Sequence, residues 1–321
     1  MTENRFAAVA REMPGWLSEF AVPSASVAVI EDDRIVWTKT FGRQTPTRAA
    51  DDRTIYDIAS LSKPVTAEVF FRLAAAGRVS LDDRMADYWI DPDLVDDPRV
   101  KRLTPRHVFT HTTGFPNWRG RSKLRFERDP GTDFGYSGEG FQFLIRYVER
   151  KLGQSYQSLA KEVLFTKAGM KNTAFSWQPW FRNRQAWPVD DDGHWNEASV
   201  VTEAMGASAV NTTTADYARF ILAVAKGDDL PEAIRAERFR IAVDQGPECR
   251  KTAKMAPICP KKMGIALGWF VVEFDDETVI GHTGSNSRGE RTIAMYSPTE
   301  RWGFVIFATG ATGDHLLQRV A

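Results

Sequence analysis

Residues 56–67 read Tyr-Asp-Ile-Ala-Ser-Leu-Ser-Lys-Pro-Val-Thr-Ala, and they contain a Ser-x-x-Lys pair, Ser60 and Lys63. The apolar residues that follow recur at helical spacing and predict a helix over residues 64–75. A serine at a helix start has its backbone N–H among the unpaired donors of that end, where it can stabilise an oxyanion. Lys63 projects from the same face and can take the serine proton if its amine is neutral, a state that burial among apolar neighbours favours.

The same spacing occurs a second time, at Ser158 and Lys161. A chain of this length contains roughly one such pair by chance. We expect Ser158 to lie within a plain amphipathic helix, whereas Ser60 begins one. This difference in context, and not the spacing, selects Ser60 as the candidate nucleophile.

Both ends of the chain have the composition of β-strands, and the middle is helical. Residues 24–30 and 34–41 predict a β-hairpin around a polar turn. Strand-like segments separated by polar or Gly/Pro-bearing turns follow near the other end, at 267–274, 278–282, 292–296 and 302–308. Helices are expected at 106–110, 141–152, 214–225 and 313–320. We therefore expect an α+β fold in which both termini build one antiparallel sheet, flanked by helices and interrupted by an inserted helical region.

This organisation divides the chain into a sheet region, residues 1–55 plus 262–321, and a mainly helical region, residues 56–261. We expect the two regions to form a single structural unit with the active site at their junction.

Composition excludes several classes of protein. The chain has 321 residues, 43% hydrophobic and 26% charged, which is typical of a globular protein with a sizeable core. Its 42 Lys and Arg balance 42 Asp and Glu, so we expect neither a general nucleic-acid binder nor a membrane-surface protein. No stretch approaches the ~20 apolar residues of a membrane span. The composition leaves the oligomeric state open.

The first residues show no apolar signal core behind a basic start, so we expect a cytoplasmic protein. A periplasmic or secreted location stays open if the start has been processed. In a reducing compartment Cys249 and Cys259 are expected as free thiols, with a local disulfide as the alternative.

Other hydrolytic signatures are missing from the sequence. There is no Gly-x-Ser-x-Gly elbow, no P-loop and no dinucleotide fingerprint. His107 and His111 have the spacing of a zinc-protease helix, but Val108 stands where that helix needs a glutamate. We expect neither a metal nor a cofactor.

Two further segments place polar groups where a cleft can form. Tyr136 lies in a glycine-flanked turn before the helix expected at 141–152, where its phenol can face a cleft. Residues 282–285, His-Thr-Gly-Ser, end a predicted strand, and the backbone N–H of Ser285 can serve as a second oxyanion donor. Taken alone, each segment is more typical of an ordinary surface turn or strand end.

Six segments in this order over ~230 residues resemble the class C β-lactamase-related serine hydrolases, a family that includes penicillin-binding proteins, D-Ala-D-Ala carboxypeptidases, D-amino-acid peptidases and esterases. The segments are YDIASLSKPVTA (56–67), GRVSLDD (77–83), VFTHTTGF (108–115), YSG (136–138), GASAVNTTTADYARF (206–220) and HTG (282–284). The resemblance implies a β-lactamase/transpeptidase-like fold and a mechanism through an acyl-enzyme.

The resemblance also implies roles for the matching residues. Ser60 is the acylated nucleophile, and its backbone N–H forms the oxyanion hole with that of Ser285. Lys63 is the proton acceptor or the group that keeps the phenol of Tyr136 ionised by lowering its pKa. The alternatives of Lys63 and Tyr136 as the base stay open, because the two can titrate as a coupled pair.

Two departures from the family pattern bear on the substrate. The second motif usually ends in Asn, and here it ends in Gly138. The third motif often begins with Lys, and here it begins with His282, followed by Thr283 and Gly284. A neutral imidazole binds a substrate carboxylate less well than an ammonium does, although a protonated His282, Arg288 or Arg291 can supply the charge.

Both departures place a carboxylesterase or D-specific peptidase, acting on a small ester, amide or D-peptide, ahead of a β-lactamase or D-Ala-D-Ala carboxypeptidase. A non-catalytic penicillin-binding-type sensor or pseudo-enzyme, and an acyltransferase, are the remaining alternatives. Aromatic residues concentrated between 175 and 196 either wall a substrate pocket or fix a long loop to the body.

Overall fold

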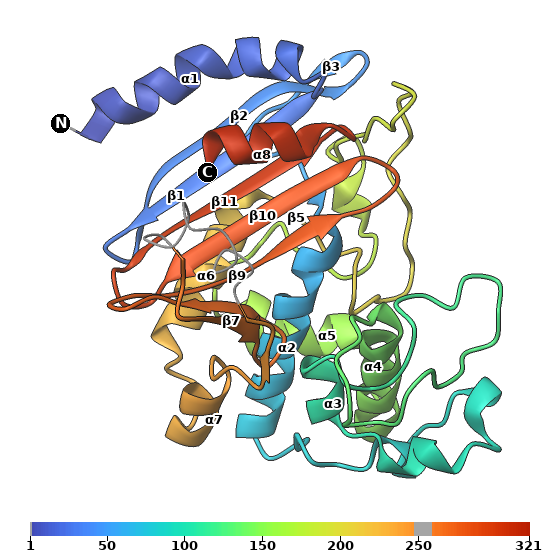
Figure 1. Ribbon diagram of the computed structural model, residues 1–321. Helices are drawn as coiled ribbons and strands as arrows, with labels where there is room; N and C mark the ends of the chain where they lie inside the picture. The colour runs from blue at the N-terminus through green and yellow to red at the C-terminus, as the bar shows by residue number, and fades with distance from the viewer. Residues whose placement is uncertain (1, 247–258) are drawn as a thin grey trace.

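The first and last strands of the chain pair with each other within one large open sheet. The computed structural model describes residues 2–246 and 259–321. In it β1 (Ser24–Glu31) and β2 (Arg34–Thr45) form the predicted hairpin, and the free edge of β1 pairs antiparallel with β11 (Trp302–Thr309). The sheet has nine strands in the order β3-β2-β1-β11-β10-β9-β8-β7-β6 (Figure 1).

The remaining strands continue this sheet or form a small second one. The large sheet is completed by β3 (Arg48–Ala49), β6 (Val243–Asp244), β7 (Lys262–Ile265), β8 (Phe270–Glu273), β9 (Thr278–Ser285) and β10 (Glu290–Ser297). The sheet thus includes β6, which precedes residue 262. A separate two-stranded sheet pairs β4 (Tyr56–Asp57) with β5 (Asn211–Thr212).

Two helices cover the outer face of the sheet. They are α1 (Thr2–Glu19) and α8 (Gly313–Val320), which lie on the same side of the sheet in Figure 1. Met13 and Leu316 pack there against Val27 and Ile306. The helix α8 was predicted from the sequence, whereas α1 was not. The apolar residues of α1 recur at helical spacing, but Pro14 and Gly15 are unfavourable within a helix and obscure this pattern.

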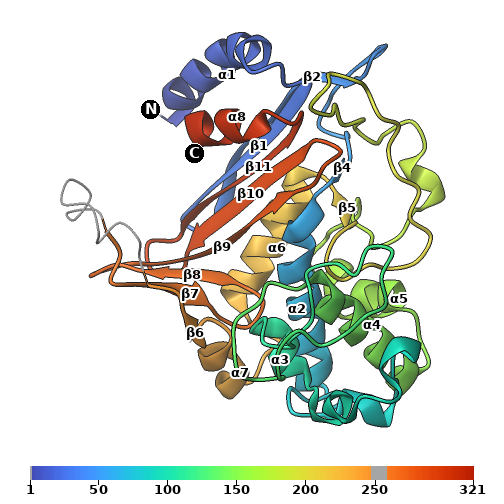
Figure 2. The same ribbon diagram turned by 45° about the vertical axis from the view of Figure 1, so that its right-hand side comes forward.

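The inner face of the sheet packs on the helical part of the chain. There α2 (Ser62–Ala75) and α6 (Thr214–Lys226) run side by side beneath the strands (Figure 2). Tyr217 of α6 packs edge-on against Phe307 of β11, and its hydroxyl donates to the carbonyl of Leu61. Successive residues of β1 alternate between the two faces, so the central strands are buried on both sides.

The remaining helical segments complete the fold, and of these the turn Ala59–Leu61 contacts β9 and β10 of the sheet. The segments are α3 (Pro105–Phe109), α4 (Gly138–Leu152), α5 (Tyr156–Ala160), α7 (Glu232–Glu237), the π-helical turn Lys161–Phe165 and the 3-10 turns Ala59–Leu61, Met85–Asp87, Pro92–Leu94, Pro98–Arg102 and Pro179–Phe181. The predicted helices are found within three residues of their expected ends. The strand expected at 267–274 is shorter, because residues 266–269 form a tight turn between β7 and β8.

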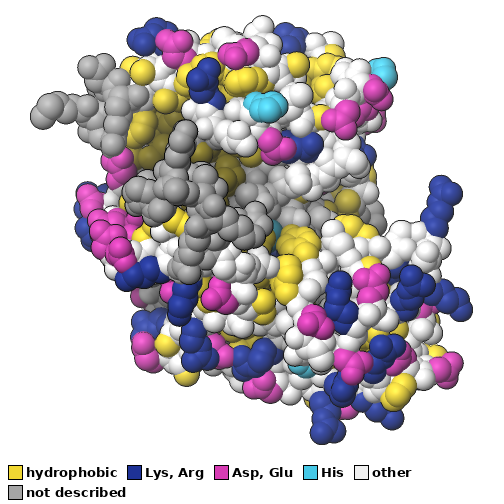
Figure 3. All heavy atoms as spheres, in the orientation of Figure 1, with side chains coloured by type: hydrophobic (Ala, Val, Ile, Leu, Met, Phe, Trp, Pro, Cys, Tyr) yellow, Lys and Arg dark blue, Asp and Glu magenta, His cyan; other side chains and the backbone are white. Residues whose placement is uncertain are grey.

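Charges of both signs are interspersed on the face shown in Figure 3. Within the part of the chain that the structure describes, no helix has the length and apolarity needed to span a bilayer. Cys259 is disulfide-bonded, which corrects the expectation of free thiols; that expectation rested on the compartment and not on geometry. Cys249 lies outside the described residues.

A buried ion triad fixes the far end of α2. The carboxylate of Glu68 accepts from Arg72 (2.6 Å) and from Arg238 (3.0 Å), and none of the three side chains is more than 5% exposed. Arg238 also donates to the carbonyl of Val224 at the end of α6. The triad therefore joins α2, α6 and the segment after α7.

Removing this carboxylate leaves two guanidinium groups buried without their partner. We expect Glu68→Gln to lower the free energy of unfolding by about 3–5 kcal/mol, measured by urea denaturation. The matched control is Glu232→Gln, which breaks the exposed pair with Arg235 and is expected to cost less than about 1 kcal/mol. Equal losses in the two variants would contradict the assignment.

Candidate active site

Ser60 and Lys63 lie together at the N-terminal end of α2. Ser60 is in the 3-10 turn that leads into the helix, and the Nζ of Lys63 is 3.0 Å from its Oγ. The same Nζ donates to the carbonyl of Ala207 (2.9 Å). Lys63 is 1% exposed, and this burial lowers the pKa of its amine to about 7. An appreciable fraction of Lys63 is therefore neutral at neutral pH.

The turn that carries Ser60 is held on several sides. The carboxylate of Asp57 accepts the N–H of Ala59 (2.8 Å), a residue at a left-handed φ of 46°. The hydroxyl of Thr292 on β10 donates to the carbonyl of Ile58 (2.9 Å). These contacts fix the backbone on the N-terminal side of Ser60.

The strand β9 contacts the same turn through Gly284. A Cβ at this position would lie 2.4 Å from the carbonyl oxygen of Ile58 and 3.1 Å from the nitrogen of Ser60. Only glycine allows so close an approach, and it brings the end of β9, with the exposed Ser285, beside the backbone of Ser60.

Tyr136 faces Ser60 from the segment before α4. Its phenol hydrogen-bonds to the Ser60 hydroxyl, and the Nζ of Lys63 lies 4.7 Å from its ring centroid. Burial raises the pKa of Tyr136 to about 12, although the bond to Ser60 opposes the rise. This corrects the expectation that Lys63 lowers the pKa of Tyr136, because desolvation of the phenol itself is the largest effect.

His111 positions Tyr136, a role that the sequence analysis missed. Its ring stacks on the phenol ring with centroids 4.4 Å apart. Its Nδ1 accepts the N–H of Ser137 (3.1 Å), and its carbonyl accepts that of Gly135 (2.8 Å), so it holds the residues on both sides of Tyr136. Burial keeps the pKa of His111 well below 6.5. The sequence signal that could have indicated this role is the position of His111 within the family-like segment 108–115.

His282 is buried and neutral. It is 3% exposed, stacks on Phe270 with ring centroids 4.2 Å apart, and has its Nδ1 2.5 Å from the carbonyl of Thr283. Burial, reinforced by the nearby Lys63, lowers its pKa to about 3. This corrects the alternative of a protonated His282, because an imidazolium would have to exist in a desolvated site.

The two arginines that were alternative partners for a substrate carboxylate are already engaged. Arg288 donates to the carbonyl of Glu197. Arg291 pairs with Asp314 (3.0 Å) and donates to two backbone carbonyls. Neither side chain replaces the missing lysine of the third motif.

Ser158 was expected to lie within a helix, but like Ser60 it lies near the start of one. The two serines differ instead in burial. It lies in the first turn of the short helix α5, exposed, where its hydroxyl accepts from Ser155 (2.9 Å). Lys161 is exposed as well. This second pair therefore lacks the burial that distinguishes Lys63.

The aromatic residues between 175 and 196 mainly fix their loop to the body. Phe175 and Phe181 are fully buried, and Trp177 and Trp180 pack against the small cluster that contains Phe181. Trp187 donates its backbone N–H to the carbonyl of Gln44 at the end of β2. These contacts agree with the interpretation of a fixed loop.

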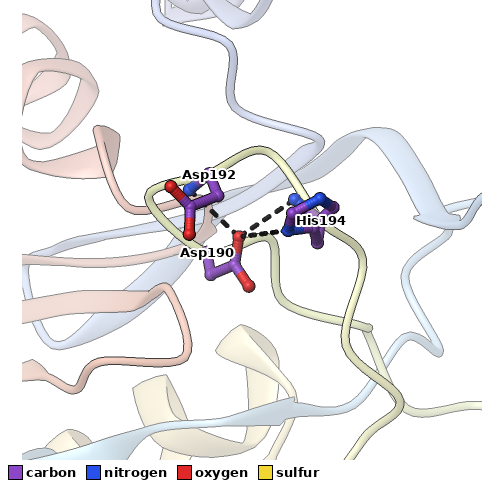
Figure 4. Close-up of side chains that lie close together, drawn as sticks. All are labelled: Asp190, Asp192 and His194. Atoms are coloured by element: carbon purple, nitrogen blue, oxygen red, sulfur yellow. Dashed lines mark hydrogen bonds and ion pairs between the residues drawn. The ribbon is translucent and has the colours of Figure 1, made fainter.

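The described residues contain one cluster with the donor types of a metal site, formed by Asp190, Asp192 and His194 (Figure 4). A carboxylate oxygen of Asp190 accepts the backbone N–H groups of Asp192 (3.1 Å) and His194 (2.9 Å) and lies 3.7 Å from the Nδ1 of His194. These bonds close an exposed turn of the loop, and we assign no metal to it.

A buried carboxyl group that senses the charge of Asp57 was missed by the sequence analysis. Glu290 at the start of β10 is 5% exposed, and its Oε2 has no hydrogen-bond partner among the described residues. Burial, together with the charge of Asp57, raises the pKa of Glu290 to about 7. Burial raises the pKa of Asp57 as well.

The folded chain therefore binds a proton at Glu290 more tightly than the unfolded chain does, and stability falls as pH rises from 4.5 through about 7. We expect Glu290→Gln to remove most of this fall, at most about 3 kcal/mol, in urea denaturation between pH 5 and 8. The exposed Glu300→Gln is the control and is expected to keep the wild-type slope. A Glu290→Gln slope equal to that of the wild type would contradict the assignment.

Two proteins of known name are similar to part of this chain in sequence. A penicillin-binding protein of Bacillus subtilis (strain 168) is 25% identical over 256 residues, 67% of this chain and 55% of that protein. The D-alanyl-D-alanine-carboxypeptidase/endopeptidase AmpH of Escherichia coli (strain K12) is 23% identical over 242 residues, 67% of this chain and 60% of that protein. The chain thus matches little more than half the length of these relatives.

The structure of the D-alanine carboxypeptidase AmpC from Burkholderia cenocepacia aligns with a TM-score of 0.77 at 20% identity, over 97% of this chain and 95% of that chain. This confirms the β-lactamase/transpeptidase-like fold expected from the sequence. The family model described as Beta-lactamase matches residues 7–320. The chain therefore belongs to the β-lactamase family of serine hydrolases.

Proposed function

We propose that the protein hydrolyses ester or amide bonds through an acyl-enzyme formed on Ser60. The observation that carries the proposal is the buried amine of Lys63, which lies 3.0 Å from the Ser60 hydroxyl with a pKa lowered to about 7. A neutral amine in hydrogen-bond contact with a serine is the arrangement that activates this nucleophile.

The acylation step uses four residues of the site. The Oγ of Ser60 bonds to the substrate carbonyl carbon while its proton passes to the Nζ of Lys63. The developing oxyanion is stabilised by the backbone N–H groups of Ser60 and Ser285. Tyr136 is protonated at neutral pH because its pKa is about 12, so it donates a hydrogen bond and relays the proton from Lys63 to the leaving group. Attack by water then releases the acid and frees Ser60.

The charges near the third motif favour a substrate that does not place a carboxylate there. His282 is neutral, and Arg288 and Arg291 are engaged elsewhere. A substrate carboxylate would therefore meet no free cation from these three residues. This favours a neutral ester or a D-specific peptide bond over a β-lactam or a terminal D-Ala-D-Ala substrate.

The nucleophile is tested by intact-protein mass spectrometry after reaction with a fluorophosphonate, a penicillin and p-nitrophenyl acetate in turn. We expect a stoichiometric adduct that is lost in Ser60→Ala, with ester turnover lower by about a thousandfold or more. Ser158→Ala is the matched control, because it removes the serine of the second Ser-x-x-Lys pair.

Fast ester turnover with a lasting penicillin adduct would support an esterase or peptidase over a β-lactamase. An adduct from every reagent without turnover would instead indicate a penicillin-binding-type sensor. No adduct in the folded wild-type protein would refute the acyl-enzyme mechanism.

The proton acceptor is tested by the pH dependence of kcat/KM for p-nitrophenyl acetate. Neutral Lys63 is required, so we expect activity to rise about tenfold per pH unit below 7 and to level off above it. The pKa of Glu290 is also about 7, so the same profile is measured in Glu290→Gln, where the rise should persist. Loss of the rise in that variant, or a flat wild-type profile, would contradict the role of Lys63.

A further inference from the structure

Gly138 has no space for a side chain because an indole ring occupies it. A Cβ at residue 138 would lie 2.6, 2.7 and 2.9 Å from three ring atoms of Trp118. These distances are too short for any side chain unless the ring moves. The glycine that ends the second motif is therefore coupled sterically to Trp118.

The indole lies on the Ser60 side of this segment. Ser137 has extended backbone angles, φ −138° and ψ 117°, and residues on either side of an extended residue point to the same face. The Tyr136 side chain points to Ser60, so a side chain added at position 138 would also point toward Ser60. Two residues span at most about 7 Å, which places the indole beside Tyr136.

The loop that carries Trp118 is fixed to the start of α4. The carbonyl of Asn117 accepts the N–H groups of Gly138 (3.0 Å) and Glu139 (3.1 Å), and its side-chain oxygen also accepts from Gly138 (3.0 Å). The backbone N–H of Arg119 donates to the carboxylate of Glu139 (3.0 Å), and its guanidinium pairs with Asp91 (2.6 Å). The backbone on both sides of Trp118 is therefore held beside Gly138.

We propose that Trp118 is a specificity-determining residue whose free indole face stacks on a flat apolar group of the substrate, next to the reacting carbonyl. Trp118 is 45% exposed, whereas tryptophan residues are highly buried on average. An aromatic face binds flat apolar groups by stacking. This inference rests on the proposed acyl-enzyme at Ser60.

The experiment compares two matched pairs of esters. In p-nitrophenyl phenylacetate and p-nitrophenyl acetate only the acyl group differs, and in benzyl acetate and ethyl acetate only the alcohol differs. For each pair the ratio of kcat/KM values, aryl over alkyl, is measured in the wild type and in Trp118→Ala. We expect the ratio to fall about tenfold in at least one pair and to be largely retained in Trp118→Phe.

Changes of less than about twofold in both pairs would overturn the proposal. The matched control is Trp16→Ala, which removes a partly buried tryptophan from α1 on the opposite face of the sheet and should leave both ratios unchanged. Fluorophosphonate labelling of wild-type Ser60 separates this failure from failure of the proposed function. Labelling with unchanged ratios refutes only the role of Trp118.

The steric coupling is tested by a double-mutant cycle between residues 118 and 138. Gly138→Ala is expected to reduce both the thermal midpoint and kcat/KM for p-nitrophenyl acetate when Trp118 is present. In the Trp118→Ala background the added methyl group fits, and the same substitution should have a much smaller effect. Equal effects in both backgrounds would show that the indole does not occupy this space.

Discussion

The burial of one lysine amine is the constraint on which the site depends. Lys63 is 1% exposed and has two hydrogen-bond partners, the Ser60 hydroxyl and the carbonyl of Ala207. Desolvation disfavours the charged form of an amine, so the fold itself lowers the pKa of Lys63 to about 7. The phenol of Tyr136 is desolvated too, and this raises its pKa to about 12. The opposite pKa shifts of these two residues thus both follow from packing.

The sheet and the helices share the task of holding this arrangement. The ion triad around Glu68 joins α2 to α6 at the end far from Ser60. At the near end, Thr292 on β10 and Gly284 on β9 contact the backbone just before Ser60. Ser60 is therefore positioned by strands from the C-terminal part of the chain and by a helix from its first quarter.

The sequence was most informative where one pattern extends over a whole element. The hairpin of β1 and β2 and the helices α2, α4, α6 and α8 follow from alternation and helical spacing, and Ser60, Lys63 and Tyr136 do meet. The pattern failed for α1, where Pro14 interrupts the helical spacing. It also gave the wrong direction for the pKa of Tyr136, because burial of two groups at once is a property of the packed site.

The contacts that the sequence could not show join residues far apart in the chain. The effect of the Asp57 charge on Glu290 and the filling of the space at Gly138 by Trp118 depend on which loops meet in the folded chain. His111 was visible within a motif, but only the structure shows that it holds both neighbours of Tyr136.

The pairing of β1 with β11 has a consequence for how the chain folds. The hydroxyls of Ser24 and Thr309 are hydrogen-bonded across 285 positions of sequence. During synthesis the hairpin of β1 and β2 emerges long before β11. The backbone edge of β1 that pairs with β11 therefore stays unpaired until nearly the whole chain has been made. Such long-range pairing slows folding, because the entropy of closing the loop is lost before any contact is gained. The nascent chain therefore has Ser60 and Lys63 well before it has the sheet that brings β9 against them.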